Sequence, residues 1–490
     1  MIDGLNAFLT LDNFLFLNIG VFLGIIFGAI PGLGVMLAIA ILLPFTFSVD
    51  PISGITMLLG IYCGGTYGGS ISAILLNVPG TPAAAATTLD GYPLARSGQA
   101  KKPLIMSVVA STIAGLVSAV ILLVAAPQLA KLTLYFGPAE YFTLALFALS
   151  IIASVSGKDI IKGLIAGCLG IFLATIGLDP ATAVTRFTFN NTYLIGGLTL
   201  VPALIGLFAF SEVLLKINGT DKVQKTNINL TKGDGLTFGE IRKSLKTIFK
   251  SSIIGTIIGV IPGTGGTSAA FISHNEAKRS SKNPENYGKG ELDGVAAAEA
   301  GNNGVTGATL IPLLTLGIPG DGATAVLLGA FMMNGLIPGP NLFTEHSTTI
   351  YAIIIGLIFV NIFMLLQGRL LINFFAKIAK LKDSFLLPIL ILTCTAGIFA
   401  EAGHTFNIYV AIAFGIIAYL LLKFEFPLVP LLLGIILGPI AEENLIRTLT
   451  ISDGSLAIFF TRPISVFFIL LTLLPLVLGF IKMVRKKEAS

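Results

Sequence analysis

The sequence predicts an all-α polytopic membrane protein with about ten to twelve transmembrane helices. Of its 490 residues, 54% are hydrophobic and only 11% are charged, and the mean hydropathy is +0.93. Soluble domains carry about 25% charged residues, so this composition excludes that class. Apolar runs lie inside stretches that can cross a hydrocarbon core of about 30 Å as helices. These runs are 116–126, 141–153, 350–366, 408–422 and 466–481.

Charge and cysteine content exclude further classes. The first 13 residues contain no lysine or arginine, so we expect no cleavable signal peptide and a first span that stays in the mature protein. The three cysteines, Cys63, Cys168 and Cys394, lie in apolar surroundings and predict neither a disulfide framework nor a transition-metal site. The net charge of +5 reflects basic loops, and we expect no nucleic-acid partner.

The distribution of basic residues predicts the topology. The longest hydrophilic stretch is basic and is therefore expected in the cytoplasm. The N-terminus, which lacks basic residues, is expected outside. The chain should then cross the membrane five times before this stretch. Its basic residues are Lys216, Lys222, Lys225, Lys232, Arg242, Lys243, Lys246 and Lys250. The second half then enters from the opposite side, which predicts two inverted repeats, 1–217 and 247–490, joined by a linker over 218–246. The loop 273–294 should then lie outside, although it carries four basic residues.

Two pairs of Pro-Gly breaks recur in the same order in both halves. "GAIPGLG" begins at Gly28 and "GVIPGTGG" at Gly259, and their prolines are 231 residues apart. "NVPGTPA" begins at Asn77 and "LGIPGDGA" at Leu316, and their first prolines are 240 residues apart. The recurrence supports one duplicated unit.

The breaks predict broken helices around a cavity inside the membrane. Unpaired backbone groups cost several kcal/mol in hydrocarbon, so non-helical chain persists there only when protein encloses it or when it lines a wet cavity. From Gly80 to the polar residue Asp90, and from Gly320 to Asn334, a helix is too short to cross the membrane. We therefore expect re-entrant hairpins over 53–95 and 295–337, with the Pro-Gly breaks at their tips. Close packing of small residues is the simpler alternative for such motifs.

Helix ends at these tips predict an anion site and a cation site. The helices that follow Gly80 and Gly320 present free N–H groups and a positive dipole end, which suit a carboxylate. The preceding carbonyls, with hydroxyl and amide oxygens, form a plausible sodium cage. The expected ion-binding residues are Thr66, Ser70, Gly263, Thr264, Thr267, Thr306 and Asp321.

Several ionisable residues allow more than one role. Asp321 either binds the coupling ion or caps the helix that follows it. Glu299 belongs either to an ion site or to a membrane interface. Asp90 is expected to pair with Arg96 at the base of its hairpin. The histidines, His274, His346 and His404, are expected to be interfacial or capping residues rather than metal ligands.

These motifs resemble a known family. The stretch "YCGGTYGGSISAILLNVPGTPAAAATTLDGYPLARSGQA" over 62–100, with "IPGTGG", "AEAGNN", "LTLGIPGDGATAVLLGA" and "GLIPGP", is similar to the large membrane subunit of the tripartite tricarboxylate transporters. The resemblance runs from Gly20 to about Pro463. It implies an elevator-like permease of the inner membrane that imports an organic anion such as citrate with Na⁺ or H⁺. It also implies two partners, a small membrane subunit of about four helices and a periplasmic solute-binding protein.

The resemblance also carries over the substrate-binding residues of the two tips. They are Asn77, Pro79, Gly80, Thr81, Pro82, Asn302, Asn303, Pro319, Gly320, Asp321 and Gly322. No cofactor is expected apart from the coupling cation. The sequence leaves open which carboxylate is carried, which cation is coupled, and whether the chain is a monomer or a homodimer.

Three other functions were weighed. Re-entrant glycine-rich loops also build channel filters, but two inverted copies in one chain favour alternating access. A membrane scaffold without a pathway leaves the paired breaks unexplained. Adjacent Ser273 and His274 diverge by about 100° on a helix and no G-x-S-x-G elbow is present, so we expect no enzyme. No phosphate-binding loop is present either, so nothing predicts nucleotide hydrolysis.

Overall fold

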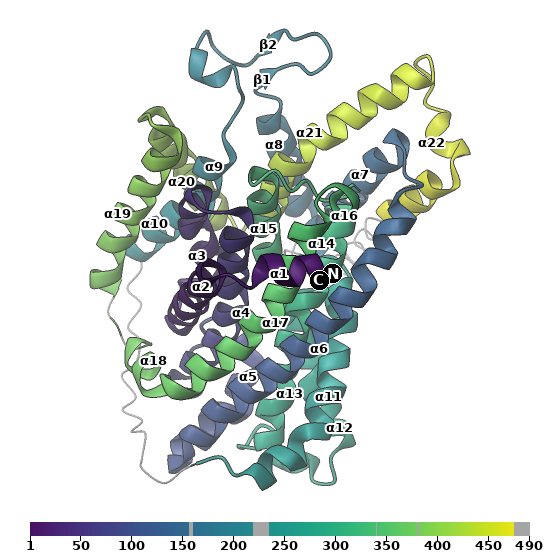
Figure 1. Ribbon diagram of the computed structural model, residues 1–490. Coiled ribbons are helices and arrows are strands. Elements are labelled where there is room, and N and C mark those ends of the chain that lie inside the picture. The colour runs from purple at the N-terminus through teal and green to yellow at the C-terminus, as the bar shows by residue number, and fades with distance from the viewer. Residues whose placement is uncertain (156–159, 219–234, 340, 380, 382, 475–490) are drawn as a thin grey trace, which may run out of the picture. The chain divides into compact units, whose positions relative to one another are not determined.

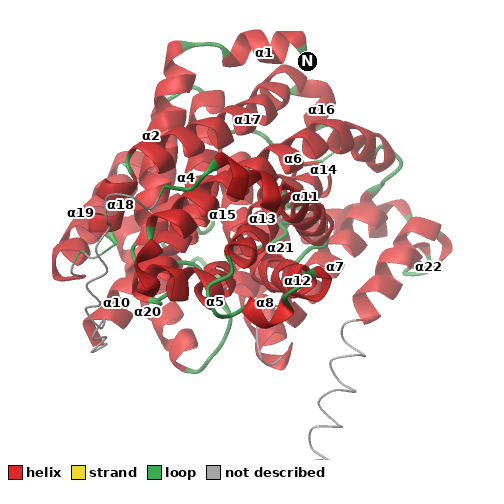
Figure 2. Ribbon diagram, turned by 90° about the horizontal axis from the view of Figure 1, so that it is seen from below, coloured by secondary structure: helices red, strands yellow, loops and turns green. Residues whose placement is uncertain are grey.

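The computed structural model describes the chain except for residues 156–159, 219–234, 340, 380, 382 and 475–490. Most of the predicted linker and the basic C-terminal tail therefore lie outside the described residues. Figure 2 shows that the described residues are mostly helical. They contain one antiparallel pair of short strands, β1 (Gly177–Leu178) and β2 (Thr185–Arg186), labelled in Figure 1. This confirms the prediction of an all-α polytopic membrane protein.

Seven helical stretches within the described residues are long and apolar enough to cross a membrane. They are Leu11–Ala29, Pro51–Leu76, Lys101–Thr133, Leu200–Ile217, Ser347–Leu370, Phe406–Lys423 and Leu428–Ile451. Six shorter apolar helices of 10–17 residues accompany them. The total of ten to twelve crossings stays a prediction.

The chain forms two compact units, and each unit takes segments from both halves of the sequence. The first unit contains Met1–Leu129 and Leu215–Gly397, and the second contains Ala130–Leu214 and Ile398–Ser490. Helices α6 (Lys101–Thr133), α10 (Ser211–Asn218) and α19 (Asp383–Ala402) span the boundaries in sequence.

The helices of the first unit are α1 (Ile2–Phe8), α2 (Leu11–Ala29), α3 (Gly34–Leu42), α4 (Pro51–Leu76), α5 (Ala85–Leu94), α11 (Phe238–Val260), α12 (Gly265–Ser280), α13 (Leu292–Ala308), α14 (Leu310–Leu316), α15 (Gly322–Met333), α16 (Leu342–Glu345), α17 (Ser347–Leu370) and α18 (Ile372–Ile378). Those of the second unit are α7 (Pro138–Val155), α8 (Ile160–Ala174), α9 (Leu200–Ile205), α20 (Phe406–Lys423), α21 (Leu428–Ile451) and α22 (Ile458–Thr461). Short 3-10 or π turns are η1 (Leu43–Ser48), η2 (Pro82–Ala84), η3 (Ala95–Gln99), η4 (Thr192–Leu194), η5 (Gly206–Phe210) and η6 (Pro284–Asn286).

In the first unit, α2 and α4 run parallel in very close contact. A Cβ atom at Gly20 would stand 2.1 Å from the Met57 carbonyl oxygen, and one at Gly28 would stand 2.1 Å from the Gly65 carbonyl oxygen. Only glycine permits this approach, which is typical of small-residue packing between membrane helices. Helix α3 returns alongside α4, because a Cβ at Gly65 would touch the Val35 side chain. The first Ile-Pro-Gly break is therefore a hairpin turn.

The second Ile-Pro-Gly break has the same form. Helix α12 returns along α11, and the Lys250 Nζ donates to the Glu276 Oε1 at 2.5 Å. Helix α13 then runs parallel to α11, with the Gly301 carbonyl oxygen 2.3 Å from the position of a Cβ at Gly255. Figure 1 shows these three helices side by side. The loop between α12 and α13 thus lies at the same end as the start of α11, which corrects the expectation that 273–294 lies on the opposite side from the linker.

The second pair of breaks differs from the predicted hairpins. After α4 the chain folds back, and the Gly80 N–H donates to the Gly69 carbonyl at 3.2 Å. Helix α5 then runs again toward the end of α4, so that a Cβ at Gly91 would touch Ile74. The helices are broken where predicted, but the segment 77–81 is an extended fold-back rather than the tip of a simple hairpin over 53–95.

The second half repeats this fold-back. A Cβ at Gly320 would stand 2.5 Å from the Thr309 Cγ2, seven residues before the end of α14. The chain after α15 then returns to the end of α14, where the Gly339 N–H donates to the Leu314 carbonyl at 3.0 Å. The region 295–337 is therefore also a broken helix with a fold-back, not a simple hairpin.

The second unit is held by close helix contacts and ion pairs. Helix α8 lies against α21, with the Leu431 carbonyl oxygen 2.1 Å from the position of a Cβ at Gly170. Buried Glu140 accepts from the Arg462 Nε at 2.5 Å, and Arg186 pairs through two nitrogens with Glu442. His404 contacts the Tyr193 ring with centroids 5.0 Å apart.

Candidate functional site

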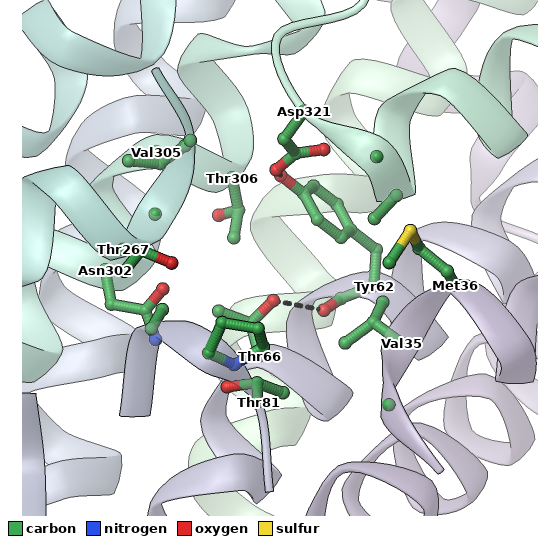
Figure 3. A pocket seen from close by; sticks show the side chains of 17 residues that line it. Val35, Met36, Tyr62, Thr66, Thr81, Thr267, Asn302, Val305, Thr306 and Asp321 are labelled. Carbon is green, nitrogen blue, oxygen red and sulfur yellow. Dashed lines mark hydrogen bonds between the residues drawn. The ribbon is translucent and has the colours of Figure 1, made fainter. Parts of the chain in front are cut away.

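A cavity of about 230 Å³ lies inside the first unit, where the four breaks meet. Figure 3 shows Asp321 and the Tyr62 ring on one side and Thr66 and Thr81 on the opposite side. The wall consists of Gly34, Val35, Met36, Tyr62, Thr66, Thr81, Pro82, Ala83, Gly265, Gly266, Thr267, Asn302, Val305, Thr306, Asp321, Gly322 and Ala323. A cavity of this size suits a small metabolite rather than a drug-sized ligand.

The wall is made of matched positions from the two halves. Gly34, Val35 and Met36 precede Gly265, Gly266 and Thr267 by 231 residues, the spacing of the Ile-Pro-Gly breaks. At the second spacing, 240 residues, the pairs are Tyr62 with Asn302, Thr66 with Thr306, Thr81 with Asp321, Pro82 with Gly322, and Ala83 with Ala323. Sixteen of the seventeen wall residues thus belong to such pairs, so both halves build the cavity equally.

Backbone conformation is repeated at the matched breaks. Gly32 and Gly263 both have φ of 81°, and Gly34 and Gly265 have φ of 67° and 62°. Residues with side chains rarely adopt these values, so the glycines are required for the turns. The two break regions also touch, because the Gly263 N–H donates to the Gly320 carbonyl at 2.9 Å.

Asp321 caps the helix that it precedes. Its Oδ1 accepts from the Thr324 N–H at 2.8 Å, and the Thr324 hydroxyl in turn accepts from the Asp321 N–H. Its Oδ2 accepts from the Tyr62 hydroxyl at 3.0 Å, and that hydroxyl also meets the Thr309 hydroxyl. Of the two roles predicted for Asp321, the structure shows the capping geometry, and both carboxylate oxygens have donors.

Two polar groups of the wall have no hydrogen-bond partner among the residues that the structure describes. They are the Thr81 Oγ1 and the Asn302 Nδ2, which are buried, with residues only 8% and 2% exposed. Buried polar atoms are nearly always hydrogen-bonded, so each unsatisfied group indicates an interaction that is still to be made. An amide N–H donates and a hydroxyl donates or accepts, so both groups can bind a carboxylate oxygen.

The wall has little charge. Among the residues that the structure describes, Asp321 is its only ionisable carboxylate, and the wall contains no lysine or arginine. An anion in this cavity would therefore meet amide, hydroxyl and backbone donors and no basic side chain. Within the same described ranges, no three His, Cys, Asp or Glu side chains gather as ligands of one metal ion.

The structure brings about half of the predicted site residues into the wall. These are Thr66, Thr81, Pro82, Thr267, Asn302, Thr306, Asp321 and Gly322. The others support the wall or lie away from it. They are Ser70, Asn77, Pro79, Gly80, Gly263, Thr264, Asn303, Pro319 and Gly320.

The residues outside the wall have structural partners. Asn77 is exposed and ends α4 in the left-handed conformation, with φ of 58°. The Ser70 hydroxyl meets the Ser107 hydroxyl at 3.0 Å, and the Thr264 hydroxyl donates to the Ile258 carbonyl. The Asn303 Nδ2 donates to the Ser111 hydroxyl at 2.8 Å. None of these side chains reaches the cavity wall.

Sequence reasoning missed Tyr62. It forms part of the wall and holds Asp321, yet an aromatic residue in an apolar run reads as ordinary core. The repeat offers the signal that was overlooked, since Tyr62 lies 240 residues before Asn302, which was predicted. The spacing of 231 residues would likewise have found Met36 from Thr267.

The structure contradicts the prediction for Asp90 and one of the two alternatives for Glu299. The Asp90 carboxylate meets the His274 Nε2 at 2.8 Å and accepts N–H donors from Gly288, Gly290 and Glu291, so its partner is not Arg96. His274 is therefore a buried partner of a carboxylate rather than an interfacial residue. Glu299 is fully buried, so it does not lie at an interface.

Comparison with known proteins gives a consistent result. Residues 14–433 match the family model described as "Tripartite tricarboxylate transporter TctA family". An uncharacterized 52.8 kDa protein in the TAR-I ttuC' 3' region of Agrobacterium vitis is 34% identical over 485 residues, which is 99% of this chain and 96% of that protein. An uncharacterized protein in the TAR-II ttuC' 3' region of the same organism is 34% identical over 234 residues, covering 48% of this chain and 97% of that protein. No solved structure matches.

Proposed function

Because the chain belongs to the tripartite tricarboxylate transporter TctA family, we propose that it is the subunit that carries a small organic di- or tricarboxylate, such as citrate, across the membrane. The family and the seven apolar helices support a multi-pass membrane transporter subunit, and in this proposal the chain has no enzymatic role. In this proposal a cation gradient, Na⁺ or H⁺, drives import.

The observation that carries the proposal is the pair of unpartnered groups in the cavity. Thr81 Oγ1 and Asn302 Nδ2 come from different halves of the chain, and both are buried without a hydrogen bond. A carboxylate bound between them would satisfy both. It would also lie beside the extended segments that lead into α5 and α15.

We further propose that the two halves are inverted repeats and that one domain, built from the broken helices of both, carries the substrate in an elevator-like movement. Helices α4 and α13 run antiparallel, because Tyr62 contacts Thr309 at the end of α13 whereas the next residue, Cys63, contacts Thr306, which lies earlier on α13. Matched elements that cross in opposite directions are typical of transporters with a central site. The matched pairs in the cavity wall support the same arrangement.

The partners follow from the family. We propose that a small membrane subunit of about four helices and a periplasmic solute-binding protein work with this chain in the inner membrane. Selection among carboxylates would begin at the binding protein, before the substrate reaches the cavity. The uptake test below also distinguishes two alternative functions, a passive channel and a scaffold without a pathway. Whether the chain forms a homodimer is tested separately by measuring the mass of the purified protein.

Uptake into proteoliposomes tests the proposal. Vesicles containing the chain and both partners would receive radiolabelled citrate, followed by a panel of di- and tricarboxylates, with and without inward Na⁺ and H⁺ gradients. Saturable, gradient-driven accumulation is the expected result. Non-saturating flux that ignores both gradients would indicate a channel, and no flux with any substrate would indicate a scaffold.

Two substitutions test the site itself. A hydrogen bond to a charged group contributes about 1.5–3 kcal/mol, and 1.4 kcal/mol is tenfold in affinity. Asn302→Ala and Thr81→Ala should therefore each weaken substrate binding by about tenfold or more. Asn444→Ala is the matched control, because its amide bonds the Ile440 carbonyl in the second unit. Equal affinities in all three variants would place the substrate elsewhere.

A further inference from the structure

Glu299 is a buried carboxyl group that the proposed carboxylate site does not use. It lies on α13 in the first unit and has no exposed surface. The Thr87 hydroxyl of α5 donates to its Oε1, and the Ser111 hydroxyl of α6 donates to its Oε2 at 3.1 Å. Glu299 therefore joins three helices through two neutral donors.

No basic side chain among the described residues pairs with Glu299. The buried glutamate of the second unit shows the contrast, because Glu140 accepts from both the Arg462 Nε and the Gly137 N–H. An isolated carboxylate is costly to bury, and such a group takes up a proton or a cation instead. Glu299 needs one of these two to balance its charge.

The other titratable groups near this part of α13 cannot supply that charge. Tyr67 of α4 interacts electrostatically with Glu299, and its buried hydroxyl has no hydrogen-bond partner among the described residues. Asp90 of α5 lies one turn beyond Thr87 and is already bound to His274 of α12. Toward the cavity, Tyr62 and Cys63 of α4 contact Thr309 and Thr306. On α6, Ser111 contributes a hydroxyl.

The packing favours a proton over a metal cation. Two hydroxyl groups contact the carboxylate oxygens directly, and Glu299 does not form part of the cavity wall. A sodium ion would require these hydroxyls to move apart to make space for it. A proton requires no space, and the two hydroxyls can donate to the ionised form or accept from the protonated form.

Glu299 also lies where its charge would act on the cavity. One turn along α13, Asn303 donates to both the Ser111 hydroxyl and the Glu299 carbonyl, and its neighbour Asn302 belongs to the cavity wall. Thr87 lies on the helix that follows the wall residues Thr81, Pro82 and Ala83. Ionisation of Glu299 would change the contact between these two sides of the wall.

We propose that Glu299 is the proton-binding site of this transporter and that the coupling cation is H⁺. The inference rests on the proposed function. One proton is bound as Glu299 becomes neutral, and it leaves as the carboxylate forms between Thr87 and Ser111. The neutral form adds no negative charge near the anion, so carboxylate affinity rises as the pH falls through the titration of Glu299.

An infrared titration tests proton binding without any substrate. The full-length protein in detergent should show a carboxylic acid C=O band that titrates with pH, and Glu299→Gln should remove that band. Glu140→Gln is the matched control and should leave the band, because Glu140 is paired with Arg462 in the second unit and does not contact Glu299 or its partners. A band that persists in Glu299→Gln would overturn the proposal.

Transport supplies the second test. The amide of Glu299→Gln resembles the protonated carboxyl. In this variant the affinity for the carboxylate substrate should stay at the low-pH value of the wild type at every pH. Accumulation driven by a pH gradient should fall at least tenfold. Glu299→Asp should restore pH dependence, which a packing role alone does not predict. If the substrate affinity of Glu299→Gln depended on pH as in the wild type, Glu299 would not be the proton-binding site. No carboxylate uptake by the wild type would instead contradict the proposed function, and the infrared result would stand separately.

Discussion

The two fold-back segments, 77–82 and 317–322, have similar backbones and different side chains. Each follows a helix that ends in a left-handed residue, Asn77 with φ of 58° or Gly317 with φ of 69°. Each continues through Pro-Gly to a residue of the cavity wall, Thr81 or Asp321. The wall residues then differ in their bonding, because Asp321 has donors on both oxygens and Thr81 has no partner.

This difference separates two tasks that one repeated backbone performs. In the second segment the Asp321 carboxylate already accepts hydrogen bonds from protein groups, because it caps α15 and accepts from the Tyr62 hydroxyl. The first segment leaves its hydroxyl free, so it can bind a ligand without breaking an existing bond. We infer that the shared backbone creates the cavity and that the unequal side chains decide which side meets the substrate.

The largest expected loss of stability comes from replacing the glycines at the matched positions 80 and 320 by alanine. A Cβ at Gly80 would stand 2.0 Å from the Gly28 carbonyl oxygen, which belongs to the backbone of another helix. At Gly320 the closest atom, at 2.5 Å, belongs to the Thr309 side chain. Overpacking costs about 1–3 kcal/mol and more when backbone must shift. Gly80→Ala should therefore lower the free energy of unfolding by more than about 3 kcal/mol, and Gly320→Ala should lower it by less.

Thermal unfolding of both variants in detergent measures this order, with size-exclusion profiles as a check on folding. Gly98→Ala is unsuitable as a control because its φ is 89°, whereas Gly196→Ala has open space around its Cβ. Equal losses at positions 80 and 320 would show that the two segments are equally constrained, contrary to the comparison.

Asp321 and Thr81 give the next largest difference. Replacing a capping aspartate by alanine costs about 1 kcal/mol, and loss of a hydrogen bond to a charged group adds about 1.5 kcal/mol or more. Asp321→Ala should thus lower stability by about 2–3 kcal/mol, and Thr81→Ala should change it by less than about 0.5 kcal/mol because no bond is lost. A Thr81→Ala variant as unstable as Asp321→Ala would contradict the assignment of separate tasks.

The sequence predicted the positions of the breaks and half of the cavity wall for a local reason. Proline, glycine and polar residues inside apolar runs are visible without any knowledge of tertiary structure. Asp321 was found in this way, and the family resemblance of the same motifs added Thr81 and Asn302. Their convergence followed from the two repeated spacings, which link positions 231 and 240 residues apart.

The remaining features depend on contacts between distant residues. Asp90 meets His274 across 184 residues, and Glu299 meets Ser111 across 188 residues. The fold-back likewise depends on the close approach of Gly80 to Gly28, which no local signal indicates. The nearby Arg96 therefore looked like the natural partner of Asp90, and the break at Pro79 looked like a hairpin tip.

The smallest expected effect concerns the residues that end α4 and α14. Asparagine and glycine both adopt the left-handed conformation readily, whereas alanine there costs about 1 kcal/mol. Asn77→Gly should therefore keep both stability and uptake, while Asn77→Ala and Gly317→Ala should each lose about 1 kcal/mol in thermal unfolding. A large loss of uptake in Asn77→Gly, with stability unchanged, would show that the Asn77 amide binds substrate or ion despite its position outside the cavity wall. Retained uptake would leave Thr81 and Asn302 as the unpartnered donors on which binding depends.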